Sequence, residues 1–204
     1  MDTPKTPERK DVPEAMTAKV DVLVIGSVDN AAGTIEPSIS LVRDGDATII
    51  IDPGIVFDQR QILEPLEALA VNPRDVSDIV FSHHHPDHTM NAGLFPNARV
   101  HDHWAIYHRN TFKFRPAEGA LIAPSVRLIA TPGHSREDIT TLVGTADGVY
   151  AFTHVWWHEA GPPADPVAAD LDQLHVSRAR ILRLADRVVP GHGKAFVPGV
   201  STPR

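Results

Sequence analysis

The sequence predicts an α/β fold with polar loops at the ends of its strands. Short apolar runs such as "VDVLVIG" (residues 20–26) and "ATIII" (residues 47–51) are typical of buried strands. Two longer segments, residues 58–70 and 165–185, space their apolar side chains as an amphipathic helix does. Histidine or aspartate follows five strands, in "DPG", "HHHPDH", "TPGH", "FTH" and "PGHG". Because loops at strand ends often carry the chemistry of sheet proteins, these loops predict one shared site.

The expected elements follow one another in a simple order. The first helix contains Pro65, which either kinks it or makes it start later. The last helix is expected to bury a stripe formed by Val167, Leu171, Leu174, Ile181 and Ala185. Between the first two strands, "SVDNAAGTIEP" is expected to be a loop and a candidate flap. Strands are expected in residues 20–26, 38–44, 47–54, 76–83, 98–103, 126–135, 139–157 (a hairpin that turns at 144–148) and 186–193.

Length and composition suit one domain, which we place at residues 18–204 behind a flexible arm at residues 1–17. The arm is polar and proline-containing, without a signal peptide, and no segment is apolar enough to span a membrane, so we expect a cytoplasmic protein. A homo- or hetero-oligomer in which the arm wraps a neighbour stays open. The net charge of -7 argues against a nucleic-acid partner. With no cysteine present, a metal would need histidine or carboxylate ligands.

The strongest local signal is "FSHHHPDHTMNAGLF", residues 81–95. Side chains alternate along an extended segment, so His83, His85 and Asp87 are expected on one side and His84 on the other. Pro86 ends the strand and suits the first turn of a helix, which would place His88 beside Asp87. The stretch therefore offers two imidazoles to one metal ion, and a carboxylate with an imidazole to another.

Two further histidines follow strands in turns of the same kind. His134 lies in "TPGH" and His192 in "PGHG", and the glycine before each allows the backbone to bend close to the site. Imidazole and carboxylate ligands together suit zinc, manganese or iron. We therefore expect one or two divalent metal ions, with zinc as the first expectation and manganese or iron as alternatives.

The string His83-x-His85-x-Asp87-His88, followed by His134 and His192, resembles the metallo-β-lactamase superfamily, and in particular its small single-domain members. The resemblance covers roughly residues 18–196 and implies an αββα sandwich of two mixed sheets with helices outside. It implies that His83, His85 and His134 hold one metal ion, that Asp87, His88 and His192 hold a second, and that a hydroxide between them attacks the substrate. It also implies that Asp52 in "IDPG" supports a ligand. Asp87 is then a candidate proton shuttle.

One position departs from the family pattern. Where the family places an aspartate that bridges both metal ions, this sequence has His154 in "FTHVWW". A neutral imidazole offers one lone pair and removes one negative charge. Three outcomes are open: His154 binds one metal ion only, one metal site is weak, or the chain is a poor catalyst that serves as a subunit. We favour the first outcome and count His154 among the ligands.

These features predict a metal-dependent hydrolase of a small molecule. The bond cleaved is an ester, lactone, thioester or activated aryl ether. Trp156 and Trp157 follow His154 directly and are both candidate substrate-binding residues. We expect one of them to pack in the core and the other to wall the pocket, where it would favour an apolar or aromatic substrate. The alternatives are a metallo-ribonuclease, iron-dependent oxygen chemistry on a sulfur substrate, and a low-activity subunit of a hetero-oligomeric hydrolase.

Overall fold

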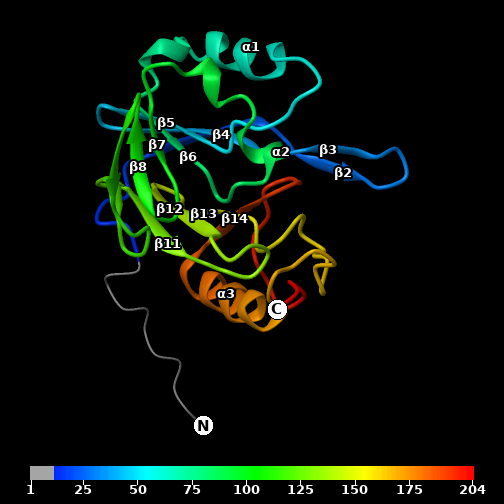
Figure 1. The fold of residues 1–204 in the computed structure, drawn as a ribbon. Helices are drawn as coiled ribbons and strands as arrows, with labels where there is room; N and C mark the ends of the chain where they lie inside the picture. The colour runs from blue at the N-terminus through cyan, green and yellow to red at the C-terminus, as the bar shows by residue number, and fades with distance from the viewer. Residues whose placement is uncertain (1–11) are drawn as a thin grey trace.

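The computed structural model describes residues 12–204 and shows two β-sheets packed face to face (Figure 1). Helix α1 (Arg60–Ala68) covers the outer face of the first sheet, and α3 (Leu171–Leu184) covers that of the second. This is the expected αββα sandwich. The first sheet has the order β1 (Lys19–Val24), β4 (Ile39–Asp44), β5 (Ala47–Ile51), β6 (Asp78–Val80), β7 (Arg99–His101), β8 (Ala105–His108) and β9 (Thr111–Phe114). The second has β10 (Leu121–Ala123), β11 (Val126–Ala130), β12 (Ile139–Thr145), β13 (Gly148–Thr153) and β14 (Arg187–Pro190).

The core forms because the central strands bury apolar side chains on both faces. Ile49 and Ile51 of β5 point into the space between the sheets, where they meet Leu128 and Val143. The alternate side chain, Ile50, points outward and packs under α1. Burial on both faces explains why the strands read as continuous apolar runs.

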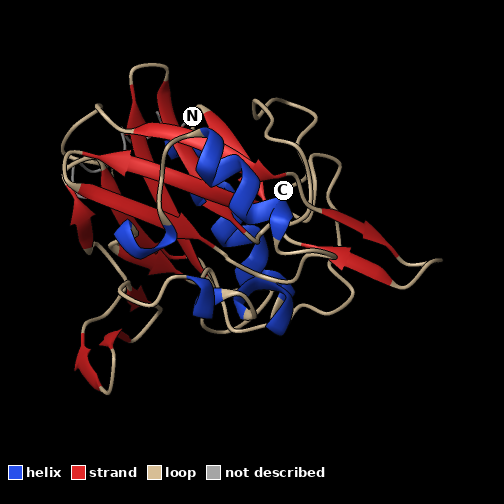
Figure 2. Cartoon of the chain, turned by 90° about the horizontal axis from the view of Figure 1, so that it is seen from above, coloured by secondary structure: helices blue, strands red, loops and turns tan. Residues whose placement is uncertain are grey.

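Parallel pairing brings the functional loops to one edge of the sandwich. Strand β5 pairs with β6, and β6 with β7, in parallel, while β13 pairs with β14 in parallel in the other sheet. Parallel neighbours have their carboxyl ends on the same side. The loops after β5 and β6 therefore lie together, as do those after β13 and β14. Ring contacts of His88 with His154 and His192 bring the loops of the two sheets to one edge. Figure 2 shows the molecule from above, with helices, strands and loops distinguished by colour.

Several elements differ from the sequence expectation, which included no strand at β8, β9 or β10. The stretch expected as a loop at residues 27–37 is a hairpin of β2 (Ser27–Asp29) and β3 (Thr34–Glu36), which projects from the sandwich (Figure 1). Each of its strands has three residues with one apolar side chain, which is too short for a period-two pattern to be recognised in the sequence. The last helix begins only at Leu171, because the Asp170 side chain accepts a hydrogen bond from the backbone N–H of Gln173 and caps it. Val167 therefore lies outside the helix and is exposed.

Pro65 lies inside α1 rather than before it, so the alternative of a later helix start is wrong. Ile62 and Leu66 of α1 and Leu174 and Ile181 of α3 are fully buried, as expected. Two other residues of the predicted stripe are not: Leu171 is 41% exposed, and Ala185 follows the end of α3 and is partly buried.

The predicted arm falls partly outside the described residues, since residues 1–11 are not described. Residues 15–17 contact Asp44, Ser125 and Gly144, and so join the two sheets at this edge of the sandwich. The hydroxyl of Thr17 donates to Asp44 of the first sheet, and its backbone N–H donates to Ser125 in the turn between β10 and β11 of the second. A Cβ at Gly144 would overlap the backbone oxygen of Ala15, so this close approach requires glycine. The domain boundary at residue 17 stays a prediction.

Within residues 12–204, none of the helices has the length and apolar content needed to span a bilayer. The cytoplasmic location and the oligomeric state stay predictions.

Asp78 of β6 forms ion pairs with Arg99 and His101 of β7, and this cluster leads to a stability prediction. Asp78 is fully buried and accepts hydrogen bonds from Arg99 at 2.8 Å and from His101 at 2.7 Å. Burial, the largest influence, raises the pKa of Asp78, but the hydrogen bonds from His101, Arg99 and Ser77 outweigh it and lower the pKa to about 2.

We expect Asp78→Asn to lower the free energy of unfolding at pH 7 by about 2 kcal/mol. Since the folded-state pKa lies below the unfolded value, this contribution is complete above about pH 4 and is lost as the pH falls towards 2. Urea unfolding of both proteins, made metal-free with a chelator, should give a stability difference that shrinks over this range. The exposed Asp75→Asn is the control. A difference that does not change with pH would contradict the assignment.

Candidate functional site

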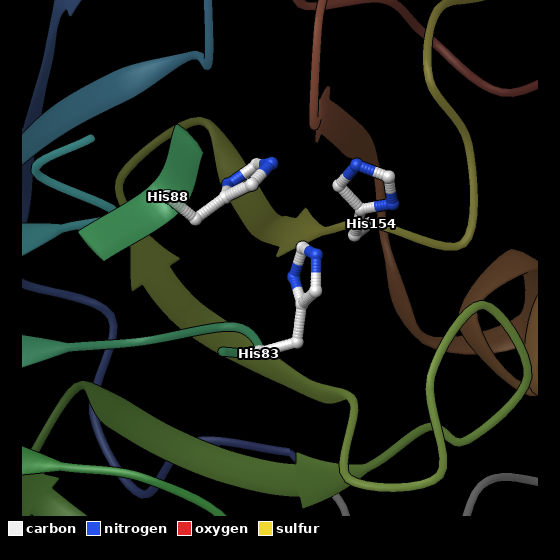
Figure 3. Close-up of side chains that lie close together, drawn as sticks. All are labelled: His83, His88 and His154. Carbon is white, nitrogen blue, oxygen red and sulfur yellow. The ribbon is translucent and has the colours of Figure 1, made fainter. Parts of the chain in front are cut away.

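Loops that are distant in sequence bring the predicted ligands together at one edge of the sandwich. Figure 3 shows His83, His88 and His154 pointing toward one another from the segment after β6, from α2 (Pro86–Thr89) and from the end of β13. Nitrogen or carboxylate oxygen atoms lie within 4.8 Å of one another in three overlapping groups. The groups are His83, His85 and His134; Asp87, His88 and His192; and His83, His88 and His154.

The local backbone follows from the sequence of this segment. His85 is extended (φ -62°, ψ 139°), and Pro86 begins the single turn of α2. This change from strand to helix turns Asp87 and His88 toward the second sheet. His84 faces the other way, as the alternation predicts: it stacks on Trp104 with ring centroids 5.4 Å apart.

In the first group, three imidazole nitrogens converge. Nδ1 of His85 lies 2.9 Å from Nε2 of His83 and 3.0 Å from Nε2 of His134. In the second group, Oδ2 of Asp87 lies 3.4 Å from Nε2 of His88 and 3.6 Å from Nε2 of His192. Nε2 of His88 is buried and has no hydrogen-bond partner.

Hydrogen bonds on the far side of each ring determine which nitrogen carries the lone pair. Nδ1 of His88 donates to Asp52 at 3.0 Å, and Nδ1 of His192 donates to the backbone oxygen of Glu36 at 2.9 Å. Nδ1 of His134 donates to Asp165 at 2.7 Å. A neutral imidazole that donates from Nδ1 keeps its lone pair on Nε2. All three Nε2 lone pairs therefore face the interior of the site.

Asp52 orders both halves of the site. Besides holding His88, it accepts hydrogen bonds from the backbone N–H and the hydroxyl of Ser82, both at 2.7 Å. Since the Ser82 proton is committed to Asp52, the Ser82 oxygen accepts from Nδ1 of His83 at 3.0 Å. One carboxylate thus directs Nε2 of both His83 and His88 inward, a wider role than the expected support of one ligand.

The electrostatics keep most of these rings neutral. Burial, reinforced by the neighbouring imidazoles, holds the pKa of His83 and of His154 well below the usual histidine value. Burial also lowers the pKa of His192 to about 4 and lowers that of His85. At His88, burial lowers the pKa, but Asp52 and Asp87 outweigh it, so the pKa is raised.

This donor set fits divalent cations. Nitrogen lone pairs that face each other across 2.9–3.0 Å repel unless a proton or a cation lies between them. The lowered pKa values keep His83 and His85 neutral, so each ring has a single N–H. The one N–H of His85 faces two Nε2 atoms, at 2.9 and 3.0 Å, and cannot give both a full hydrogen bond. Neutral imidazoles with a carboxylate, each oriented by an outer hydrogen bond, are the usual surroundings of a protein-bound transition metal.

His154 lies in the middle of the cluster. Its ring centroid is 4.0 Å from that of His134, 4.6 Å from His83 and 4.8 Å from His88. Its Nε2 lies 3.0 Å from Nε2 of His192, and its buried Nδ1 has no hydrogen-bond partner. The imidazole fits because residue 191 is glycine: a Cβ there would lie 2.7 Å from Nε2 of His154.

The two tryptophans divide between core and site. Trp156 is fully buried, packs on Phe196 and donates to the backbone oxygen of Pro203, so its expected contact with substrate is wrong. The chain reverses side-chain direction between the two residues. Trp157 lies against the rings of His134 and His192, with centroids 6.4 Å and 6.3 Å apart. Its role in binding substrate stays a prediction.

Three features of the site were not predicted from the sequence. Asp165 is 31 residues from His134, and no spacing or motif marks it as a partner. Ser82 precedes the histidine string and has no distinctive pattern. Glu36 contributes its backbone oxygen, which no side-chain pattern reveals.

A groove of about 450 Å³ adjoins the site on the side of the β2–β3 hairpin. Both of its walls are bonded to segments that carry candidate ligands: Glu36 accepts from His192, and the N–H of Ile55 donates to the backbone oxygen of Asp87 at 2.8 Å. The wall side chains include the partly exposed Ile35 and Ile55 and the almost fully exposed Phe57 (97%).

Comparison with known proteins agrees with this architecture. The metallo-β-lactamase domain-containing protein 1 of Xenopus laevis is 29% identical over 188 residues, which are 87% of this chain and 80% of that protein. Its human counterpart is 33% identical over 162 residues, 72% of this chain but only 59% of the human protein.

Solved structures share the fold. A protein of Thermotoga maritima described as a putative metallo-β-lactamase superposes with a TM-score of 0.73 and 22% identity, over 89% of this chain and 100% of that chain. A quorum-quenching N-acyl homoserine lactone hydrolase superposes with a TM-score of 0.63 and 16% identity, over 89% and 94% of the two chains. A lactonase described as dizinc and bound to its product gives a TM-score of 0.59 and 20% identity, over 76% and 72%.

A sequence profile described as the metallo-β-lactamase superfamily matches residues 33–197, which include every candidate ligand. Metal sites of this fold hold one or two divalent ions, in agreement with the overlapping donor groups found here. The chain therefore belongs to the metallo-β-lactamase superfamily.

Proposed function

We propose that this protein is a metal-dependent hydrolase that acts on a small molecule with an apolar group. The observation that carries the proposal is the convergence of oriented lone pairs: the Nε2 atoms of His88, His134 and His192 all face one interior, each fixed by a partner behind the ring. Divalent ions held there supply water of near-neutral pKa and polarise a substrate carbonyl.

Asp87 is the candidate for proton transfer. Its Oδ2 lies between His88 and His192, and its side chain stays 13% exposed, so it is open to the substrate side of the site. A carboxylate in this position accepts the proton of the attacking water and delivers it to the leaving group.

We propose zinc as the metal. Six of the seven candidate ligands are imidazoles, which suit zinc and iron better than manganese, a metal that prefers oxygen ligands. A solved relative in dizinc form and another in di-iron form leave iron as the alternative.

The substrate class is proposed from the groove. Its walls offer Ile35, Ile55 and Phe57 for an apolar substituent, and they end at the segments bonded to His192 and Asp87. An ester, lactone or thioester with an acyl chain, or an activated aryl ether, presents an apolar part and a bond to cleave. The lactone acted on by the similar hydrolase belongs to this class.

The test is a hydrolysis panel of esters, acyl lactones, thioesters, nitroaryl ethers and RNA, with the protein loaded with zinc, manganese or iron. We expect one acyl or aryl class to be cleaved. The purified protein should contain about one to two metal equivalents per chain. Phe57→Ser should raise KM more than it lowers kcat. Val200→Ser, equally exposed but outside the groove, is the control. Cleavage of RNA alone would replace the proposal by a ribonuclease, and a protein without metal after native purification would refute it.

The central histidine leads to a separate prediction. We expect His154→Asp to tighten binding of the second zinc ion, because a carboxylate restores a negative charge and a second ligand oxygen between the two ion positions. Zinc titration by calorimetry should show a steeper second step than in the wild type. Unchanged stoichiometry and affinity would contradict the charge argument.

A further inference from the structure

The segment between β13 and α3, residues 155–170, contains a buried carboxylate that contacts one of the candidate ligands. Asp165 is only 3% exposed. Its Oδ2 accepts two hydrogen bonds, from Nδ1 of His134 at 2.7 Å and from the indole N–H of Trp157 at 3.0 Å. Its Oδ1 accepts from the backbone N–H of Val167 at 3.0 Å.

We propose that Asp165 is a positioning residue for His134, and that Trp157 completes this contact by sharing Oδ2. The inference rests on the proposed metal site and adds a second carboxylate behind its ligands, separate from Asp52. Asp52, at the end of β5, orients the histidines of the 83–88 segment, whereas Asp165 orients the ligand that comes from the second sheet.

The carboxylate acts on His134 in two ways. It fixes the tautomer, because Nδ1 must carry the proton in order to donate to Oδ2. It also fixes the orientation of the ring, so that Nε2 faces Nδ1 of His85 at 3.0 Å. Partners of this kind typically change metal affinity by 10–100-fold when they are removed.

Asp165 is held by the scaffold and not by His134 itself. The fully buried Arg178 of α3 donates to the backbone oxygens of Val155, Pro162 and Pro163 at 2.7, 2.8 and 2.7 Å. These three bonds fix the segment that carries Asp165 and Trp157 at two places, at residue 155 and at residues 162–163. The carboxylate is therefore in place before a metal ion arrives, which is how a positioning group limits the cost of ordering its ligand.

The turn that carries His134 is fixed by the same segment. The N–H groups of Ala169 and Asp170 donate to the backbone oxygens of His134 and Gly133, both at 3.0 Å. Backbone and ring of His134 are thus held from one side by one segment. The side chain of Asp165 bonds to His134 and to no other candidate ligand, so a change of this side chain should act on the first group of ligands and spare the second.

The experiment measures metal affinity and the ring proton separately. In zinc titrations with a competing chelator, Asp165→Asn should weaken one zinc site about 10–100-fold and leave the other within about threefold. The neighbouring exposed Asp170→Asn, which alters only the cap of α3, is the matched control. Equal weakening of both sites, or of neither, would overturn the proposal.

Nuclear magnetic resonance of the metal-free protein supplies a signal that a general structural defect would not produce. With nitrogen-15 histidine, the Nδ1–H proton of His134 should be downfield and slow to exchange in the wild type. It should be lost in Asp165→Asn, while that of His88 stays.

A second variant, Trp157→Phe, keeps the carboxylate. It should shift this resonance and change zinc affinity by less than about threefold, which provides a test even if Asp165→Asn does not fold. A His134 proton that is unaffected by both variants would refute the contact. None of these readouts needs a substrate, so an inactive protein that loses one zinc site selectively supports Asp165 while refuting the proposed hydrolase.

Discussion

Replacing His83 and His85 together with alanine is expected to abolish hydrolysis and to remove about one metal equivalent per chain. Both rings belong to the group that includes His134, and Nδ1 of His85 faces the Nε2 atoms of the other two. Without them, His134 is the single remaining donor of that group, and one imidazole does not retain a divalent ion against water and buffer. The activity should fall to the rate measured without protein.

Metal analysis by mass spectrometry and the rate on the best substrate of the panel check this result. The control carries His108→Ala and His175→Ala, which remove two exposed imidazoles far from the donor groups. The control should keep both its metal content and its rate. Full activity in the His83 and His85 variant would mean that the reaction does not use this site.

Gly54→Ala is expected to disrupt the second group of ligands. A Cβ at this position would overlap the backbone oxygen of Asp87 and lie 2.7 Å from Cα of His88. The turn is bound closely to α2, because Ile55 donates to Asp87 and the backbone oxygen of Gly54 accepts from Asn91 at 2.6 Å. A methyl group must push the two segments apart, and both ligands move with α2.

We expect this variant to lose about one metal equivalent and to fall in activity at least about a hundredfold, because displacement of ligands by 1 Å already costs that much. Overpacking should also lower the free energy of unfolding by about 1–3 kcal/mol. The control is Gly93→Ala in the next turn, where a Cβ meets no atom within 4 Å. Equal metal content in both variants would show that the turn tolerates the shift.

Much of the fold was accessible from sequence because its signals are local. The segments 20–24, 39–44 and 47–51 are rich in apolar side chains, and they form strands in the structure. Pro86 after the histidine string begins the turn of helix that was predicted there. In contrast, β2 and β3 have few apolar side chains, and their pairing across a four-residue turn depends on the backbone rather than on a pattern.

The site shows the same division. His83, His85, Asp87 and His88 are predictable because six consecutive positions carry the donors, and the strand-to-helix change at Pro86 determines their directions. The tryptophans were less accessible, since two adjacent aromatic residues give no indication of which one points inward. The structure buries Trp156 under the second sheet and leaves Trp157 beside the ligands.

The sequence by itself determined the donor atoms, their order along the chain and the family to which that order belongs. These properties follow from residue type and short-range spacing. Only the tertiary structure decided that His154 lies at the centre of the other imidazoles, that Gly191 leaves room for its ring, and that Asp165 stands behind His134. These contacts depend on the packing of segments more than 30 residues apart in the sequence, or on the two sheets meeting at one edge. A local pattern of side chains carries no information about contacts between such distant segments.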